Sequence, residues 1–151
     1  MATLTADAVP YRRETVDGEV IARLKVADAG AVVRGQVLQF DDAQPNEVRN
    51  VVLNATAGFA GIALEGGAVG EVIDVLQRGR IVTTVNDTVA IGDEGISYYA
   101  DTANTNNNPA DIVPSSVNNL PVGTCGRVIT TGAQNTNLVA VDIEADGFAS
   151  R

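Results

Sequence analysis

Short apolar runs separated by turn-forming residues recur along the whole chain, and this spacing constrains the fold more than any single motif. The runs are EVIARLKV, AVVRGQVLQF, VRNVVLN, GIALE, EVIDVLQ, RIVTTV, GISYY, CGRVIT and LVAVDIE. Many short strands at fairly even spacing are typical of an all-β sandwich or barrel. Aromatic residues make up only 4% of the chain and Trp is absent, so small aliphatic side chains must fill the core. We therefore predict an all-β fold, a small β-barrel or β-sandwich.

The run at residues 138–144 has the clearest strand pattern. Apolar β-branched residues alternate with small or acidic ones, Val139, Val141 and Ile143 against Ala140, Asp142 and Glu144. Successive side chains of a strand point to opposite faces of its sheet, so this pattern predicts one buried and one solvated face. We predict a half-buried strand here.

The stretch GGAVGEVIDVLQRGRI, residues 66–81, is compatible with two structures. Its apolar residues recur at helical spacing, but many of them are β-branched and lie between glycines, which favours a strand. The surrounding strand pattern favours a hairpin in which EVIDVLQ pairs with RIVTTV after a turn at Gly79, with the helix as the alternative. GGAVG lacks the following Lys and Ser/Thr of a phosphate-binding loop, so we predict a tight turn there.

The chain divides into an arm, one domain and a short tail. Residues 1–18 are predicted to form an extended N-terminal arm, residues 19–146 a single β-barrel domain, and residues 147–151 a C-terminal tail. A free arm either stays disordered or adds a strand to the exposed sheet edge of a neighbour. The second alternative makes Pro10, Tyr11, Arg12 and Arg13 candidate partner contacts.

Residues 101–123, DTANTNNNPADIVPSSVNNLPVG, are predicted to form a long Asn/Pro-rich loop within the domain. Asn side chains satisfy local backbone groups, and the prolines limit the entropy lost when the loop becomes ordered. Such a loop either packs on a neighbouring subunit or partner, or is a flexible surface segment. The first alternative makes Asn106, Asn107 and Asn108 candidate contacts.

The formal net charge is −9, with Lys25 the only lysine against 19 acidic residues. A field of this sign repels polyanions, so direct binding to nucleic acid is not expected. No stretch approaches the roughly 20 apolar residues of a membrane span, and the N-terminus lacks the basic start and apolar run of a signal peptide. We expect neither a nucleic-acid nor a membrane partner, and synthesis in the cytoplasm.

Histidine is absent from the sequence, which excludes Ser-His-Asp and Cys-His catalytic arrangements and removes the commonest zinc ligand. The lone Cys125 cannot form an intrachain disulfide, and we expect it to be a small core residue. The acidic pairs in DDAQPNE and GDEG lack the alternating ligand spacing of a calcium loop and suit solvated turns. We expect no enzyme activity, no catalytic residue, no metal and no cofactor.

Arg78 and Arg80 flank Gly79 and have two interpretations. Either they form an anion site or a charge pair with an acidic neighbouring subunit, or they keep the tip of a hairpin soluble. Both are retained as candidate partner contacts.

Three stretches in order carry a family resemblance: FAGIALEGGAVGEVIDVLQRGRIVTTV, VAIGDEGISYYAD and VGTCGRVITTGAQNTNLVAVDI. They contain a Gly-Ile-Ala-Leu strand at residues 61–64, a Gly-Glu turn into a valine-rich strand at 70–76, and a second Gly turn at 79. A Gly-Asp turn precedes an aromatic strand at 92–99, and two late strands follow at 126–129 and 138–143. This order resembles the head-decoration, or capsid cement, proteins of tailed bacteriophages, over residues 59–144 and more loosely from near residue 19. The arm and the Asn/Pro loop depart from the compact family pattern.

The resemblance implies a small β-barrel that associates, usually as a trimer, on the outer surface of an assembled head. There it would clamp neighbouring subunits of the major capsid protein and stabilise the expanded head. The implied partners are the major capsid protein and further copies of this chain, and the implied location is the virion's outer surface. An acidic protein suits that location because packaged DNA repels it.

A ligand- or carbohydrate-binding β-barrel module of a phage tail or fibre is the alternative function. Such sites often use aromatic platforms, and Tyr98 and Tyr99 are the adjacent pair available. Neighbouring residues of a strand point to opposite faces, so at most one of the two would line a given site.

Overall fold

The chain folds entirely into β-structure in the part that the structure describes. The computed structural model describes residues 11–41, 43–44, 46–50, 58–100, 112–114, 120–134 and 136–145. The strands are β1 (Arg12–Glu14), β2 (Val20–Val26), β3 (Val37–Phe40), β4 (Glu47–Asn50), β5 (Phe59–Ala63), β6 (Val72–Thr83), β7 (Ser97–Ala100), β8 (Ile112–Val113), β9 (Leu120–Thr130) and β10 (Leu138–Glu144). The predicted all-β class is confirmed. None of the described segments is a helix long and apolar enough to cross a membrane.

Five strands close into a barrel, in the order β2–β4–β3–β5–β6 with β6 pairing back to β2. The β2–β4 pair is parallel, and the other four pairs are antiparallel. Small aliphatic residues fill the barrel interior: Leu24, Val26, Val32, Leu38, Val48, Ala60, Ala63, Ile73 and Val75. Closure leaves no free strand edge in this ring, so each of the five strands has a partner on both sides.

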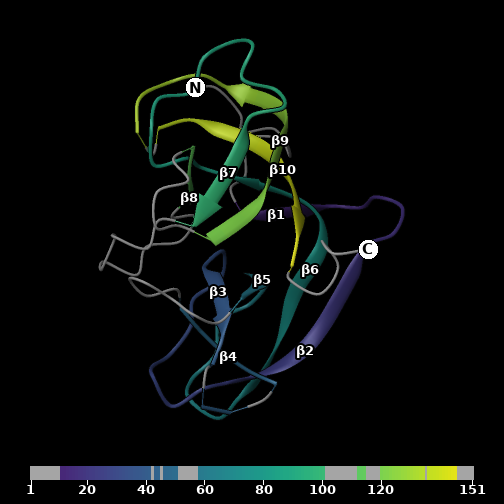
Figure 1. Ribbon diagram of the computed structural model, residues 1–151, viewed down its shortest axis with the longest axis vertical. Coiled ribbons are helices and arrows are strands. Elements are labelled where there is room, and N and C mark those ends of the chain that lie inside the picture. The colour runs from purple at the N-terminus through teal and green to yellow at the C-terminus, as the bar shows by residue number, and fades with distance from the viewer. Residues whose placement is uncertain are drawn as a thin grey trace, which may run out of the picture.

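The other strands form an open sheet, called here the upper sheet, in the order β1–β6–β10–β9–β7–β8. It uses residues 78–83 of β6, whereas residues 72–78 of the same strand pair with β2 of the barrel. Figure 1 shows β7–β10 grouped in the upper half, β2–β5 in the lower half, and β6 running between them. One long strand therefore links the two regions.

A second core lies between the barrel wall and the upper sheet. It contains Val37, Phe59, Ile62, Leu76, Ile81, Val85, Val89, Tyr98, Ala100, Ile112, Val122, Cys125, Val139, Val141, Ile143 and Ala145. Strand β5 separates the two cores and is buried along its whole length. A bulge at Ala60 and Gly61 breaks its alternation, so that Phe59 and Ile62 both face the second core.

Gly61 is required where β5 crosses β6. Its φ of 138° is unfavourable for other residues, and a Cβ there would lie 2.6 Å from Val75 Cγ1 and closer still to the Leu76 carbonyl oxygen. The absence of a side chain therefore lets the two backbones approach at the junction of the cores.

From Val72 onward the stretch 66–81 is a strand and not a helix, as predicted, but the predicted hairpin at Gly79 is wrong. The two predicted strands are one, β6, and Arg78, Gly79 and Arg80 pair with consecutive residues of β10. Partners distant in sequence occupy both edges of β6 and keep it extended, which a local turn signal cannot reveal. The actual turn that leads into β6 lies at GGAVG, where the Glu71 amide donates to the Ala68 carbonyl, as predicted.

The predicted loop 101–123 is wrong at two places. Ile112–Val113 forms β8 on the edge of β7, and β9 begins at Leu120. Pro121 is tolerated inside β9 because the register slips beside it, and β10 pairs with β9 only from Gly123 onward. The rest of the predicted loop, including Asn106, Asn107 and Asn108, lies outside the described residues.

The predicted strand at 138–144 is β10, with the predicted bounds. Val139, Val141 and Ile143 enter the second core, and Asp142 and Glu144 lie on the opposite, more accessible face. Ala140 shares that opposite face but is fully buried, so β10 is covered on both sides in the middle of the upper sheet.

Candidate functional site

The described end of the N-terminal arm docks on the upper sheet of its own chain. Residues 12–14 form β1 along the upper part of β6, and the Tyr11 amide donates to the Val82 carbonyl at 2.6 Å. The Tyr11 ring lies over Gly35, where a Cβ would come within 2.5 Å of it. Arg34 also donates to the Tyr11 carbonyl at 3.1 Å. The arm thus adds a strand within its own chain, and contact with a neighbour remains a prediction.

A row of charged side chains crosses the upper sheet beside this arm. Glu14, Arg80 and Asp142 are direct cross-strand partners on β1, β6 and β10, so their side chains share one face. Arg80 makes a two-pronged contact with Asp142, Nε to Oδ1 at 2.7 Å and Nη2 to Oδ2 at 3.0 Å. The hydrogen bonds with Asp142, together with the charges of Asp142 and Glu14, raise the pKa of Arg80.

Arg127 of β9 extends this charged row. Its Nη2 donates to Glu14 Oε2 at 3.1 Å, and Arg12 lies 3.5 Å from the same oxygen. The ion pairs therefore connect β1 directly to β9 and run over β6 and β10, which fastens the arm across the sheet. Arg13 makes a separate pair with Glu19 at 2.6 Å, at the start of β2.

Gly126 makes room for the Arg80–Asp142 pair. It is the extra residue of a bulge, because Arg127 pairs with Ala140 while Cys125 pairs with Val141. A Cβ at Gly126 would lie 2.7 Å from Arg80 Nη2 and 2.8 Å from Asp142 Oδ2. A glycine bulge therefore opens the space that this ion pair occupies.

Two adjoining grooves open at the junction of the barrel and the upper sheet. The first, of about 310 Å³, is lined by residues that include Asp17, Arg78, Gly79 and Glu144. The second, of about 290 Å³, runs along Tyr99 and Pro121, and both grooves share Gly123, Thr124 and Glu144. A side chain at Gly123 would collide with the backbone of β10, so only a glycine fits there. Gly123 lines both grooves.

Cys125 is a buried core residue, as predicted. Burial raises its pKa, and burial also raises the pKa of Tyr98, whose hydroxyl lies in hydrogen-bond contact with the thiol. The neutral thiol is a weak nucleophile, so the environment of Cys125 is that of a structural residue. Among the described residues no group of three or more His, Cys, Asp or Glu side chains is placed to hold a metal ion.

The structure brings together two of the three predicted groups of contact residues. Tyr11, Arg12 and Arg13 of the arm lie along the strand that carries Arg78 and Arg80. Arg78 is exposed and lines the first groove, whereas Arg80 is engaged by Asp142 of the same chain. The hairpin-tip interpretation of both arginines is wrong, because they lie in the middle of β6. Pro10 lies outside the described residues.

Sequence reasoning missed the other members of the charged row, Glu14, Arg127 and Asp142. Asp142 alone had a local signal, its place on the polar face of a strongly alternating strand. The pairing of these residues depends on strand order, which joins positions more than 60 residues apart. No sequence spacing reports such a contact.

The fold is shared with solved structures of other proteins. No protein-family model matches the chain, and no curated protein matches it significantly. A chain from the capsid of Myoviridae phage XM1 has a TM-score of 0.68 and 16% identity, covering 95% of this chain and 94% of that one. The head fiber gp8.5 N base of bacteriophage phi29 has a TM-score of 0.51 and 12% identity, covering 83% of this chain and 94% of that one. Both are components of phage heads, and at these identities the likeness establishes a shared fold.

Proposed function

We propose that this chain is a structural protein of a phage head that binds the outer surface of the capsid and cements neighbouring subunits of the major capsid protein. The observation that carries the proposal is the likeness to a capsid chain over nearly the whole length of both molecules. The turn-and-strand order of the sequence resembles that of capsid cement proteins. This resemblance supports the same function independently of the structural comparison.

The charge of the chain supports an outer location. A net charge of −9 gives repulsion from packaged DNA, which favours the outside of a filled head over its inside. The protein would be made in the host cytoplasm and become part of the virion. The proposal includes no catalytic role, since histidine is absent and burial raises the pKa of the single thiol.

Mechanical stiffness supports the cement role. The barrel and the upper sheet share strand β6 and a core packed between them, so a force on one region is transmitted to the other through strands and close-packed side chains. A copy bound across a joint between capsid subunits would add interface area there. If it prefers the expanded lattice, mass action stabilises that state. We propose that it acts as a homotrimer, as the family resemblance implies.

The likeness to a head fiber base favours a second candidate, a module at the base of a fibre that binds a ligand or carbohydrate. The groove along Tyr99 and Pro121 is where such a ligand would bind. The Tyr98 side chain is fully buried in the core, so Tyr99 is the tyrosine to test.

A sedimentation assay with undecorated heads of the source phage tests the cement function. Purified protein is added to expanded and unexpanded heads, and the bound copies per head are counted. We expect saturation at a number fixed by the capsid lattice, on expanded heads only, and greater resistance of the decorated heads to heat. Absence of binding to both forms would contradict the cement function. A glycan-array signal that Tyr99→Ala abolishes would then support the second candidate.

A further inference from the structure

The turn between β6 and β7 presents isoleucine side chains to solvent at one end of the molecule. Residues 90–96, called here the tip turn, contain Ile91, which is 90% exposed, and Ile96, which is 36% exposed. Ile91 is the most exposed of the large apolar side chains in the described part of the chain. Two such side chains on one short turn form an apolar contact point that folding of this chain leaves unused.

Hydrogen bonds hold the tip turn in one shape. Asp93 Oδ2 accepts from the Ala90 amide at 2.9 Å, and the Asp93 carbonyl accepts from the Ile96 amide at 3.1 Å. The backbone of Cys125 in β9 exchanges two further bonds with the turn, from the Gly95 amide at 2.7 Å and to the Ile96 carbonyl at 2.8 Å. Because the backbone of the turn is already held, little backbone entropy is lost when the turn docks into a partner's pocket.

The segment that leads from β6 into the tip turn is held by the buried side-chain amide of Asn137. Asn137 is fully buried, accepts from the Val85 amide at 2.8 Å and donates to the Asp87 carbonyl at 2.8 Å. Val89 also forms a bridge with Gly132. The residues 84–89 that lead into the tip turn are therefore held by the connection between β9 and β10.

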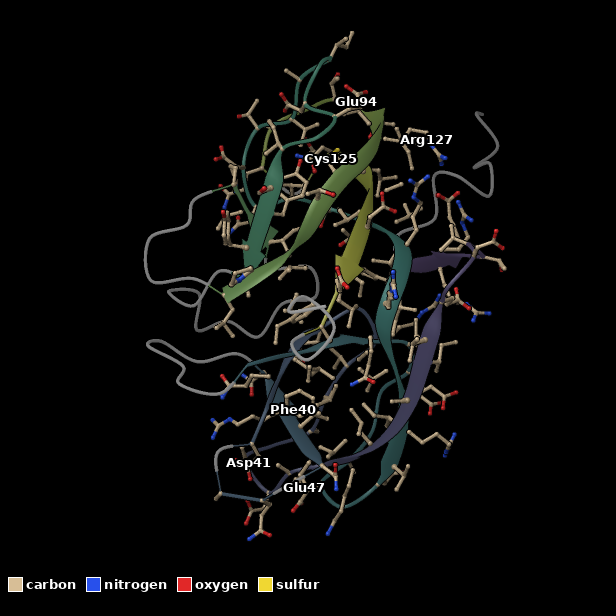
Figure 2. All side chains as sticks on the ribbon, turned by 45° about the vertical axis from the view of Figure 1, so that its right-hand side comes forward. Phe40, Asp41, Glu47, Glu94, Cys125 and Arg127 are labelled. Atoms are coloured by element: carbon tan, nitrogen blue, oxygen red, sulfur yellow. The ribbon has the colours of Figure 1, made fainter. Side chains whose placement is uncertain are left out.

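The charged residues of the tip turn and of the segment that leads into it are all acidic. They are Asp87, Asp93 and Glu94, and the sequence has no Lys or Arg from Ile81 to Gly126. Arg127 on the neighbouring β9 is engaged by Glu14 of the arm. Figure 2 shows Glu94 near one end of the molecule, far from Asp41 and Glu47 near the other. The barrel differs because Arg23 and Lys25 there pair with Asp74 and Glu47.

We propose that the tip turn is a docking surface whose partner is a capsid subunit with an apolar hollow bordered by Lys or Arg side chains. Ile91 would enter the hollow, and Glu94 would face the basic border. This inference rests on the proposed function and specifies which surface performs it. A second copy of the chain fits less well, because two tips brought together would oppose carboxylates of the same sign.

Head binding by point variants tests the tip. Ile91→Ser removes the apolar side chain, and Glu94→Gln removes one charge with little change in shape. Val69→Ser is the matched control, because Val69 is 49% exposed on the turn between β5 and β6. All three positions are exposed, so thermal melts should match those of the unmodified protein.

We expect Ile91→Ser to weaken binding to expanded heads about tenfold or more, and Val69→Ser to leave it unchanged. Glu94→Gln should weaken binding about two- to fivefold and reduce its dependence on salt. If the unmodified protein binds and Ile91→Ser binds equally well, the tip inference is wrong while the cement function stands. If the unmodified protein binds no heads, both fail. If Ile91→Ser instead dissociates an oligomer in sedimentation velocity, the tip is a contact between copies and the proposed partner is wrong.

Discussion

The barrel and the upper sheet are stabilised in different ways although they share strand β6. The barrel closes on itself, and the buried residues of its described core are all aliphatic, with the partly buried Phe40 packed against them. The upper sheet is open, and among the described strands β1 and β8 each pair along one edge only. Its packing includes Tyr98, Cys125 and the fully buried Asn137, and one of its faces carries the charged row. Closure pairs the barrel strands on both sides, whereas the open sheet adds the charged row to its apolar core.

This difference shows where a small β-protein can place a binding function. A closed barrel buries its backbone polar groups without specific side chains, so it tolerates a uniform composition. An open sheet has edges, connecting turns and polar junctions that present side chains to a partner. Both grooves and the tip turn lie in or next to the upper sheet, so we expect changes there to alter binding more than changes in the barrel.

The largest expected loss of stability comes from replacing glycine by alanine where two strand backbones approach most closely, once in each region. A Cβ at Gly123 would lie 2.8 Å from the Asp142 carbonyl carbon in the upper sheet, and Gly61 is equally crowded in the barrel wall. Because backbone is the obstacle in both places, the strands must separate. We expect Gly123→Ala and Gly61→Ala each to lower the free energy of unfolding by about 3 kcal/mol in urea denaturation.

Gly70→Ala is the control for these variants. Gly70 has a φ of 86° but open space around its Cβ position, so its replacement tests backbone strain without overlap. We expect a loss of about 1–2 kcal/mol. If Gly123→Ala costs no more than this, close approach of β9 and β10 is not what holds the upper sheet together.

A smaller effect should appear at alkaline pH, and its origin lies in the upper-sheet core. Burial raises the pKa values of Cys125 and Tyr98, so both groups stay protonated in the folded state. Above the ordinary pKa values of about 8.5 for Cys and 10 for Tyr, the unfolded chain loses these protons first. Stability is therefore constant with respect to these groups below pH 8 and falls as pH rises through 9 and 10, by about 1–2 kcal/mol at pH 10.

Urea denaturation of the unmodified protein and of Cys125→Ala at pH 7 and pH 10 measures this effect. Cys125→Ala should be less stable at pH 7, because it leaves a cavity, but it should lose less stability between the two pH values. Equal losses in both proteins would exclude the buried thiol as a cause. The barrel core should contribute nothing to this pH dependence, because among the described residues it contains no titratable side chain.

The smallest expected effect compares one ion pair from each region by double-mutant cycles. Arg80 and Asp142 are 27% and 44% exposed and bind through two parallel hydrogen bonds, whereas Arg23 and Asp74 on the barrel are 64% and 41% exposed. We expect a coupling energy of about 1 kcal/mol for the first pair and below about 0.5 kcal/mol for the second. The cycles use Arg→Leu with Asp→Asn. Equal coupling energies would mean that the charged row gives the upper sheet no special stability.

Most strands could be predicted from the sequence, because apolar runs and turn residues are local signals. Strand β10 has the predicted bounds, and the turn at GGAVG and the burial of Cys125 are as expected. Strand β1 has almost no apolar signal, since it is Arg-Arg-Glu, and it exists because the edge of β6 offers it backbone partners. Strand β8 has only two residues and depends likewise on β7.

The candidate site was predictable only in part. Arg12, Arg13, Arg78 and Arg80 stand out in a chain with few cations, but their carboxylate partners could not be chosen from the sequence. The exposed isoleucines of the tip turn had no signal either. From the sequence, Ile91 is an apolar residue that would be expected in the core. Only the structure shows that the turn directs it to solvent.

The sequence by itself determined the class of fold, the aliphatic core, the acidic surface and the absence of histidine chemistry. These properties follow from composition and from the period of two in the apolar pattern, and both are independent of strand order. The tertiary structure alone decided that Gly79 lies inside a continuous strand, that the arm returns to its own sheet, and that Arg80 meets Asp142. Each of these outcomes depends on which strands lie side by side, and contacts between residues distant in the chain determine that order.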